Sequence, residues 1–257
     1  MHCKTPYDPH EAVATIEFAG GGDCSGALLN QNVDQDKIRP FFLTANHCTS
    51  GEQNELAIFY FNFQSPICYL LPGPTNYSIS GAWKLSDAYK SDFSLLEFME
   101  PIPPHYDAYY AGWDSRGTSN KPTHTASIHH PKGDTKKWSY DHHQPIPDSR
   151  YGLPLFPNAF WKIDNWEDGV TEGGSSGGPL FDQNGRVVGQ LLGGYSDCDN
   201  HGASDWYGKM SWSYNSDPDP TDRLIDRLDP GWTGITHLNG RKKCWEYLYY
   251  QGYTIHG

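Results

Sequence analysis

Short apolar runs alternate with turn-forming residues along most of the chain. Residues 12–18 alternate strictly between two faces, a period of two that is typical of a half-buried β-strand. The same kind of run predicts further strands over 25–29, 39–45, 56–63, 93–98, 109–113, 123–129, 159–163, 179–181, 187–192 and 207–212. Many short strands with frequent turns between them indicate an all-β sandwich or a pair of barrels.

One segment has the spacing of a helix instead. Residues 221–228 place three aliphatic side chains on one helical face. Asp219 suits the cap and Pro220 the first helical position, while Pro230 ends the segment. We therefore expect a single short helix near the C-terminus.

Three prolines, Pro101, Pro103 and Pro104, break the chain after the first group of strands. The 257 residues suffice for one large β domain or two small ones that share an interface. We expect an N-terminal barrel over residues 1–104 and a C-terminal barrel over residues 105–257, together forming one unit.

Charge and hydropathy exclude two classes of partner. The formal net charge of −12 argues against nucleic-acid binding, which requires a basic surface. No apolar run approaches the roughly 18 residues of a membrane helix. We expect no nucleic-acid or membrane partner and a monomeric protein.

The cysteines point to an oxidising compartment. There are six, Cys3, Cys24, Cys48, Cys68, Cys198 and Cys244. None forms a C-x-x-C pair, which argues against zinc, and an even count fits three disulfides, with six reduced thiols as the alternative. Residues 1–12 lack the apolar region of a signal peptide. We expect a secreted protein, extracellular or periplasmic, whose signal peptide is not present in this chain.

The strongest candidate for chemistry is the run Gly-Gly-Ser-Ser-Gly-Gly-Pro over residues 173–179. A nucleophilic serine needs an exposed hydroxyl and free backbone N–H groups that can hold an oxyanion, and glycines let the backbone approach the substrate. We expect Ser176 as the nucleophile, with the N–H groups of Gly174 and Ser176 as the oxyanion hole. A flexible turn is the alternative, although a strand follows at once.

Two further residues fit the partners of such a serine. His47 follows an apolar strand and precedes Cys48, so a strand end and a disulfide would hold a general base in place. Asp92 leads into an apolar strand, where a buried carboxylate could accept the imidazole N–H. Taken alone, the histidine could be a packed or surface residue and the aspartate a turn residue.

Taken together, these motifs resemble the chymotrypsin family of serine peptidases. The matching residues are T-A-x-H-C around His47, D-F-S-L-L around Asp92 and G-S-S-G-G-P around Ser176, in the order His, Asp, Ser. The resemblance implies two packed six-stranded antiparallel barrels with the catalytic triad in the cleft between them. It also implies a serine endopeptidase that acts through an acyl-enzyme on Ser176.

Further motifs resemble the bacterial lysyl endopeptidase branch. They are Y-A-G-W-D at 110–114, I-H-H-P at 128–131, G-V-T-E at 169–172, V-G-Q-L at 188–191, S-D-x-Y-G-K at 204–209 and R-L-x-D-x-L-D-P at 223–230. In that branch the aspartate of S-D-x-Y-G lies at the base of the specificity pocket. The resemblance therefore implies that Asp205, with Leu192 and Gly193, binds a basic side chain, lysine or possibly arginine. Leu192 stands where the branch has a histidine, which weakens a strict preference for lysine.

The resemblance also implies a disulfide pattern, Cys24–Cys48 under the catalytic histidine and Cys3–Cys68. Cys198 matches a family cysteine whose usual partner has no counterpart here, so we pair it with the additional Cys244. Ser175 stands where animal members have an aspartate that pairs with a new N-terminus. Activation by that ion pair is not expected.

We expect no metal and no cofactor. The pairs His129–His130 and His142–His143 were considered, but neighbours on a strand point to opposite faces and rarely chelate. The acidic residues near 217–222 lack the glycine and the distal glutamate of a calcium loop, so capping of the following helix explains them better.

The expected partner is a polypeptide substrate. Three alternatives were weighed. They are a weak or inactive peptidase fold that only binds, a serine peptidase with another preference before the cleaved bond, and a lipase or esterase. The last is excluded, because its histidine would come last in chain order.

Overall fold

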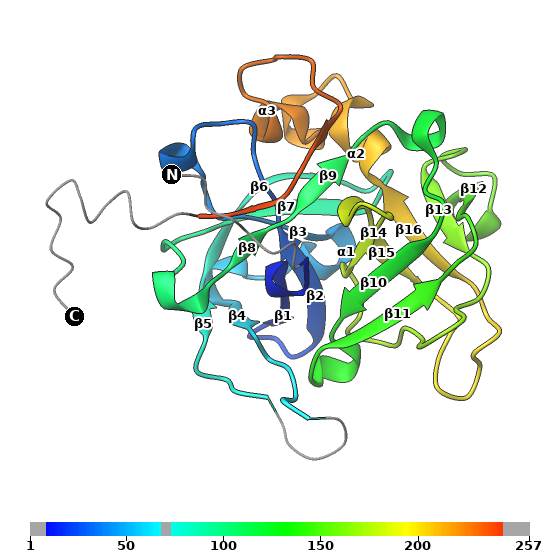
Figure 1. The fold of residues 1–257 in the computed structure, drawn as a ribbon, viewed down its shortest axis with the longest axis horizontal. Helices are drawn as coiled ribbons and strands as arrows, with labels where there is room; N and C mark the ends of the chain where they lie inside the picture. The colour runs from blue at the N-terminus through cyan, green and yellow to red at the C-terminus, as the bar shows by residue number, and fades with distance from the viewer. Residues whose placement is uncertain (1–8, 68–72, 244–257) are drawn as a thin grey trace, which may run out of the picture.

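Two curled β-sheets make up most of the fold, one in each half of the chain (Figure 1). The computed structural model describes residues 9–67 and 73–243. The prediction of an all-β fold is confirmed, although several strands had no clear signal in the sequence.

The first sheet has the order β5-β4-β1-β2-β3-β7-β6 and pairs antiparallel throughout. Its strands are β1 (Val13–Glu17), β2 (Asp23–Leu28), β3 (Phe41–Ala45), β4 (Ile58–Phe61), β5 (Ser78–Ser80), β6 (Ala82–Ala88) and β7 (Phe93–Phe98). The two outermost strands, β5 and β6, are separated only by Gly81, whose φ is +79°. The N–H of Gly81 donates to the carbonyl of Ala57 at 2.8 Å, and its carbonyl accepts from Met99 at 3.1 Å. One bent strand therefore closes the sheet, which makes a six-stranded barrel.

The second sheet follows the same plan, with the order β11-β10-β14-β15-β16-β13-β12. Its strands are β10 (Thr125–His129), β11 (Lys137–Asp141), β12 (Ile146–Asp148), β13 (Phe160–Ile163), β14 (Pro179–Phe181), β15 (Arg186–Gly194) and β16 (Asp205–Lys209). The outermost strands, β11 and β12, are again neighbours in sequence, joined by residues 142–145. A further strand, β9 (Gly112–Asp114), pairs in parallel with β15, so this sheet is not purely antiparallel.

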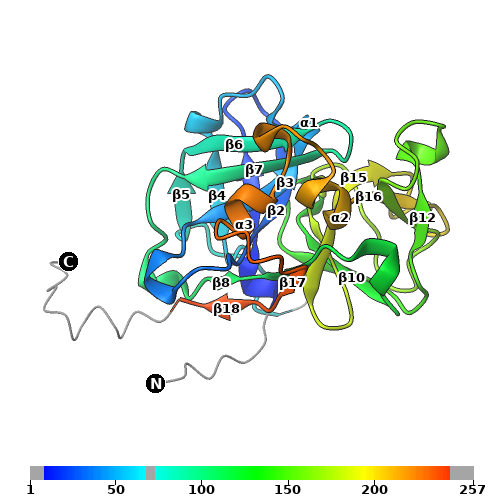
Figure 2. The ribbon, with the colours of Figure 1, turned by 90° about the horizontal axis from the view of Figure 1, so that it is seen from above.

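The end of the described chain returns to the first barrel. β17 (His237–Leu238) pairs with β9, and β18 (Arg241–Lys242) pairs with β8 (Tyr109–Tyr110). Figure 2 shows β18 beside β8 on the side of the first barrel. Residues after the proline-rich segment thus pack on both halves.

The helices are short and differ from the single predicted one. They are α1 (Asn46–Thr49), α2 (Met210–Asn215) and α3 (Ile225–Leu228), and the 3₁₀ turns are η1 (Pro9–Ala12), η2 (Gln35–Lys37), η3 (Asn54–Leu56), η4 (Pro104–Tyr106), η5 (Gly117–Asn120), η6 (Pro131–Gly133), η7 (Arg150–Gly152) and η8 (Pro220–Asp222).

The predicted helix over 221–228 is wrong as one element. Asp219 does cap η8, since its side chain accepts from the N–H of Thr221. However, Arg223 is extended (φ −148°), because the N–H of Leu224 bonds to the carbonyl of Ser213 instead of continuing the helix. The strand expected over 207–212 likewise ends at Lys209, where α2 begins.

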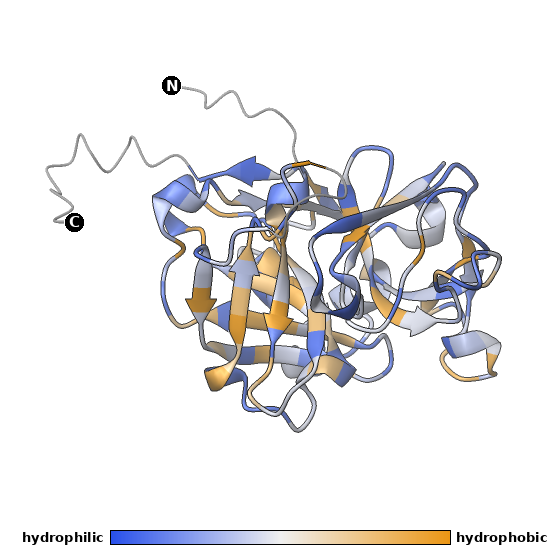
Figure 3. Cartoon of the chain, turned by 90° about the horizontal axis from the view of Figure 1, so that it is seen from below, coloured by the Kyte–Doolittle hydropathy of each residue, from blue (hydrophilic) through white to orange (hydrophobic). Residues whose placement is uncertain are grey.

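Within the described residues, the interior has an aromatic core in the first barrel, a second core between the barrels and two smaller apolar clusters in the second barrel. The first contains Phe42, Phe59, Phe61 and Phe98 with Tyr106. Figure 3 shows hydrophobic residues, in orange, along the strands of the barrel on the left of the view. The second joins residues from both halves, such as Phe93, Trp113 and Leu228. Burial of this shared apolar surface holds the two barrels together.

No helix in the described residues is both long and apolar enough to span a membrane.

Candidate active site

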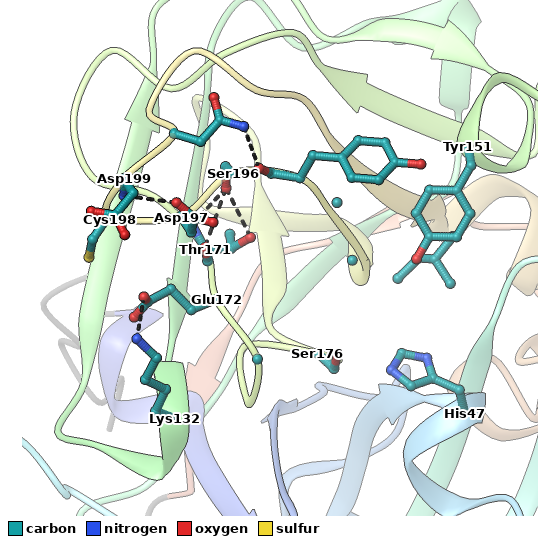
Figure 4. A pocket seen from close by; sticks show the side chains of 16 residues that line it. His47, Lys132, Tyr151, Thr171, Glu172, Ser176, Ser196, Asp197, Cys198 and Asp199 are labelled. Carbon is teal, nitrogen blue, oxygen red and sulfur yellow. Dashed lines mark hydrogen bonds and ion pairs between the residues drawn. The ribbon is translucent and has the colours of Figure 1, made fainter.

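A cleft of about 830 Å³ contains residues from both halves of the chain. His47 comes from the first barrel, and Ser176, Leu192 and Gly193 come from the second. Figure 4 shows the His47 ring directed toward Ser176 across this cleft. The fold therefore brings together residues that lie far apart in the sequence.

Asp92 fixes His47 through two hydrogen bonds. The imidazole Nδ1 lies 2.8 Å from Oδ2 of Asp92, and the backbone N–H of His47 donates to Oδ1 at 3.1 Å. Asp92 is fully buried and occupies the left-handed region (φ +57°) in the turn between β6 and β7. Because its carboxylate can only accept, it holds the histidine in the tautomer with the proton on Nδ1 and the free lone pair on Nε2.

A disulfide anchors the histidine from the other side. Cys24 on β2 is bonded to Cys48 on α1, the pairing implied by the family resemblance. Among the described residues, these two cysteines and His47 cluster as possible metal ligands. Both sulfurs are engaged in the disulfide and are not available to a metal.

The loop around Ser176 leaves its amides free. Gly174 has φ +87°, a conformation that favours glycine. Neither Gly174 nor Ser176 donates its N–H to an acceptor in the described parts of the chain. Ser25 on β2 supports the loop twice, because its N–H donates to the carbonyl of Ser176 at 2.7 Å and its hydroxyl to that of Gly174 at 2.9 Å. The arrangement is suited to binding an oxyanion.

Asp205 lies behind the wall of the cleft. The residue is fully buried, and its Oδ2 accepts from Trp166 at 2.7 Å, Thr171 at 2.8 Å and the Ser196 hydroxyl at 2.7 Å. Its Oδ1 has only the long contact of 3.4 Å from the Ser196 N–H and lies against Gly194. Within the described residues, no lysine, arginine or histidine pairs with this carboxylate.

Comparison with known proteins gives the family. The family model described as lysyl endopeptidase, C-terminal domain, matches residues 2–208. The chain belongs to the lysyl endopeptidase family. It is 32% identical over 203 residues to the lysyl endopeptidase of Pseudomonas aeruginosa, an alignment that covers 73% of this chain and 41% of that protein. The chain thus spans about two fifths of this curated relative.

Solved structures show the same fold at low identity. Protease Anisep from Arthrobacter nicotinovorans has a TM-score of 0.56 at 16% identity, covering 78% of this chain and 90% of that one. The thermostable serine protease AL20 from an extremophilic microorganism has a TM-score of 0.55 at 14% identity, with 78% and 91% covered. A scabies mite inactivated protease paralogue has a TM-score of 0.54 at 19% identity, with 79% and 91% covered. The chymotrypsin-like fold expected from the sequence is confirmed.

A buried series of hydrogen bonds, which sequence reasoning missed, supports the Ser176 loop of this lysyl endopeptidase family member. His129 had no predicted role at the site, yet its Nδ1 lies 2.8 Å from the hydroxyl of Ser175 and its Nε2 lies 3.1 Å from that of Ser139. Ser139 donates to the carbonyl of Val170, and Ser175 accepts from the N–H of Glu172.

The donor and the acceptor of each hydrogen bond in this series follow from the groups at its two ends. The carbonyl of Val170 can only accept, so Ser139 must accept from His129 Nε2–H, and Nδ1 must accept from Ser175. Burial lowers the pKa of His129 to about 3, with a smaller effect from Lys137. The neutral ring thus connects the strand β10 to Ser175, the residue before Ser176.

Leu192 and Gly193 line the cleft as the family resemblance implies, together with an aromatic wall. Leu192 packs with Trp206, and the rings of Tyr151 and Tyr195 lie 5.5 and 5.8 Å from that of Trp206. No motif marks this wall in the sequence, because its members come from three separate segments.

One predicted disulfide, Cys24–Cys48, lies within the described residues. Cys198 is exposed on the rim of the cleft beside Glu172 (Figure 4) and has no disulfide partner among the described residues. Its predicted partner Cys244 lies outside those residues, as do Cys3 and Cys68, so the pairs Cys198–Cys244 and Cys3–Cys68 stay predictions.

Proposed function

We propose that this protein is a serine endopeptidase that cleaves peptide bonds after basic residues, with His47, Asp92 and Ser176 as its triad. The meeting of the His47–Asp92 pair with Ser176 in one cleft carries the proposal. The two loop amides without an acceptor, those of Gly174 and Ser176, add the second requirement of acyl transfer.

The reaction begins when the Ser176 hydroxyl attacks a peptide carbonyl. His47 Nε2 takes the hydroxyl proton, and Asp92 stabilises the imidazolium that forms. The amides of Gly174 and Ser176 hold the oxyanion. His47 then gives the proton to the leaving amine, and a water molecule, activated by the same histidine, hydrolyses the acyl-enzyme.

The preference for a basic residue rests on Asp205. A buried carboxylate without a cationic partner is costly, and a lysine or arginine side chain of the substrate would supply the missing charge. Oδ1 retains the capacity to accept, since its one contact is long. Leu192 and the aromatic wall provide an apolar passage for the methylene groups of a long cation.

The test compares two carboxylates of the same region. Asp205→Asn is expected to lower kcat/KM for lysyl peptides by about two orders of magnitude or more, because a buried charge pair loses one partner. Asp199→Asn, at an exposed carboxylate on the cleft rim, is the matched control and should change it little. Profiling both variants and the wild type against a peptide library measures the effect.

The experiment distinguishes a wrong assignment of the specificity from a wrong assignment of the peptidase activity. If the wild type reacts with a fluorophosphonate at Ser176 but prefers a non-basic residue, the role of Asp205 is wrong and the peptidase stands. If Ser176 does not react at all, the chain is a binding protein on a peptidase fold.

We also propose an oxidising location, secreted or periplasmic. The disulfide at Cys24 and Cys48 supports this, because such bonds persist outside the reducing cytosol.

A further inference from the structure

The corner between β11 and β12 gathers side chains that can bind metals. Asp141 ends β11, and His142 and His143 follow it. Each of the three offers a ligand atom, and these atoms all lie within 4.8 Å of one another. This corner belongs to the connection that closes the second barrel, apart from the catalytic cleft.

The two histidines converge because they lie beyond the strand. On a strand, neighbouring side chains would point to opposite faces, which was our reason for expecting no metal here. The backbone instead turns after Asp141, whose Oδ1 accepts from the N–H of His143 at 3.0 Å. The ring centroids of His142 and His143 lie only 3.9 Å apart.

A second segment places a carboxylate beside this group, next to the three residues whose ligand atoms lie within 4.8 Å of one another. Glu167 accepts a hydrogen bond from Nδ1 of His142. The backbone fixes its distance from the corner, because the N–H groups of Glu167 and Asp168 both donate to the carbonyl of Tyr140, at 2.9 and 3.1 Å. Glu167 is therefore held beside His142 before any ion binds.

The carboxylates around the two rings have an arrangement that is common at metal sites. Asp141 and Glu167 each hydrogen-bond one of the rings. At metal sites, such a carboxylate orients the imidazole ligand or becomes a ligand itself.

We propose that Asp141, His142, His143 and Glu167 form a binding site for a divalent transition metal such as Zn²⁺. Imidazole ligands favour zinc, copper or nickel over magnesium and calcium, which prefer oxygen. The bound ion would tie the barrel corner to the 166–172 segment. Because Trp166 of that segment donates to Asp205, metal binding would stabilise the backing of the specificity pocket.

Direct zinc titration tests the site without relying on activity. The full chain carrying Ser176→Ala, which avoids self-cleavage, is titrated with ZnCl₂ by calorimetry. One saturable equivalent is expected, and His142→Asn and His143→Asn should each weaken it by about tenfold or more. His105→Asn, at an exposed histidine of the first half, is the control and should leave the affinity unchanged. MgCl₂ should not bind at this site.

Thermal unfolding supplies a second measurement. Zinc at 100 times its Kd should raise Tm by roughly 5–10 °C in the parent chain, and the double variant H142N/H143N should lose this shift while keeping the Tm of the zinc-free parent. The absence of a saturable equivalent, or variants that bind zinc as tightly as the parent, would overturn the proposal.

Discussion

The two barrels follow one closing plan but differ in what fills them. In the first barrel the rings of Phe59 and Phe98 lie 4.6 Å apart, and Phe42 packs on both. The second barrel has an apolar cluster of its own, with Trp161, Leu180 and Tyr207, and beside it a hydrogen-bonded group of polar residues that includes the fully buried His129 and Asp205.

This difference matches the parts that the halves contribute to the site. The first barrel holds His47 through its hydrogen bonds to Asp92 and through the disulfide of the adjacent Cys48, so the histidine has little freedom. The second barrel positions the Ser176 loop and Asp205 through hydrogen bonds. Buried polar networks specify geometry but are sensitive to protonation and to the loss of one member.

The largest expected effect on activity comes from a substitution in the first barrel. Asp92→Asn should lower kcat by roughly 10³–10⁴, because an amide can donate to Nδ1 and favour the wrong imidazole tautomer. Folding should persist, since the substitution preserves shape. Steady-state kinetics on a lysyl ester measure the loss, and Asp36→Asn at an exposed site is the control. A decrease below tenfold would contradict the role of Asp92.

The next expected effect is a loss of folding stability in acid, which originates in the second barrel. Burial lowers the pKa of His129 and of His130 to about 3, whereas a histidine in the unfolded chain titrates near 6.5. Below that value the unfolded chain binds more protons, so stability present at neutral pH is lost as the pH falls from about 6.5 toward 3. Each histidine should account for a loss on the order of 4 kcal/mol.

Urea unfolding at a series of pH values measures this loss. His130→Gln keeps an N–H for the carbonyl of Asp134, which His130 Nδ1 contacts at 2.9 Å, and should remove about half of the acid slope. His105→Gln, on the surface of the first half, is the control. An unchanged slope in His130→Gln would show that acid acts elsewhere.

The smallest expected effect comes from removing one hydroxyl group from the second barrel. Ser175→Ala deprives His129 of its donor and Glu172 of its acceptor, so we expect a loss of about 1–3 kcal/mol in unfolding free energy. Because the loop also positions Ser176, kcat should fall more than KM rises. Ser80→Ala, at an exposed strand position, should change neither. If Ser175→Ala and Ser80→Ala had equal free energies of unfolding, the buried hydrogen bonds through His129 would not stabilise the Ser176 loop.

Much of the first barrel could be predicted from its sequence. The runs that became β3 and β7 are dense in apolar residues, and both strands are buried along their whole length. The strands β6 and β11 had no such signal, because they are polar and partly exposed. Their pairing depends on closing the barrel, which involves partners that no local pattern reveals.

The candidate site divides in the same way. The glycines around Ser176 and the order His, Asp, Ser could be recognised in the sequence, because glycine runs and strand ends are short local patterns. The hydrogen bonds through His129 and the exposed position of Cys198 were not visible, because they depend on which distant segments meet. The closeness of the His142 and His143 rings depends on the turn of the backbone after Asp141.

The sequence by itself determined the all-β class, the residue types for acyl transfer and their order, since strand period, turn residues and glycine freedom act over a few positions. Only the tertiary structure decided how the Gly81 bend and the β11–β12 corner close the barrels, which cysteines meet, and what satisfies Asp205. The physical reason is that burial and hydrogen-bond partners come from segments beyond the range of a local pattern, such as Cys24 and Cys48 at a separation of 24 residues and Trp166 and Asp205 at a separation of 39.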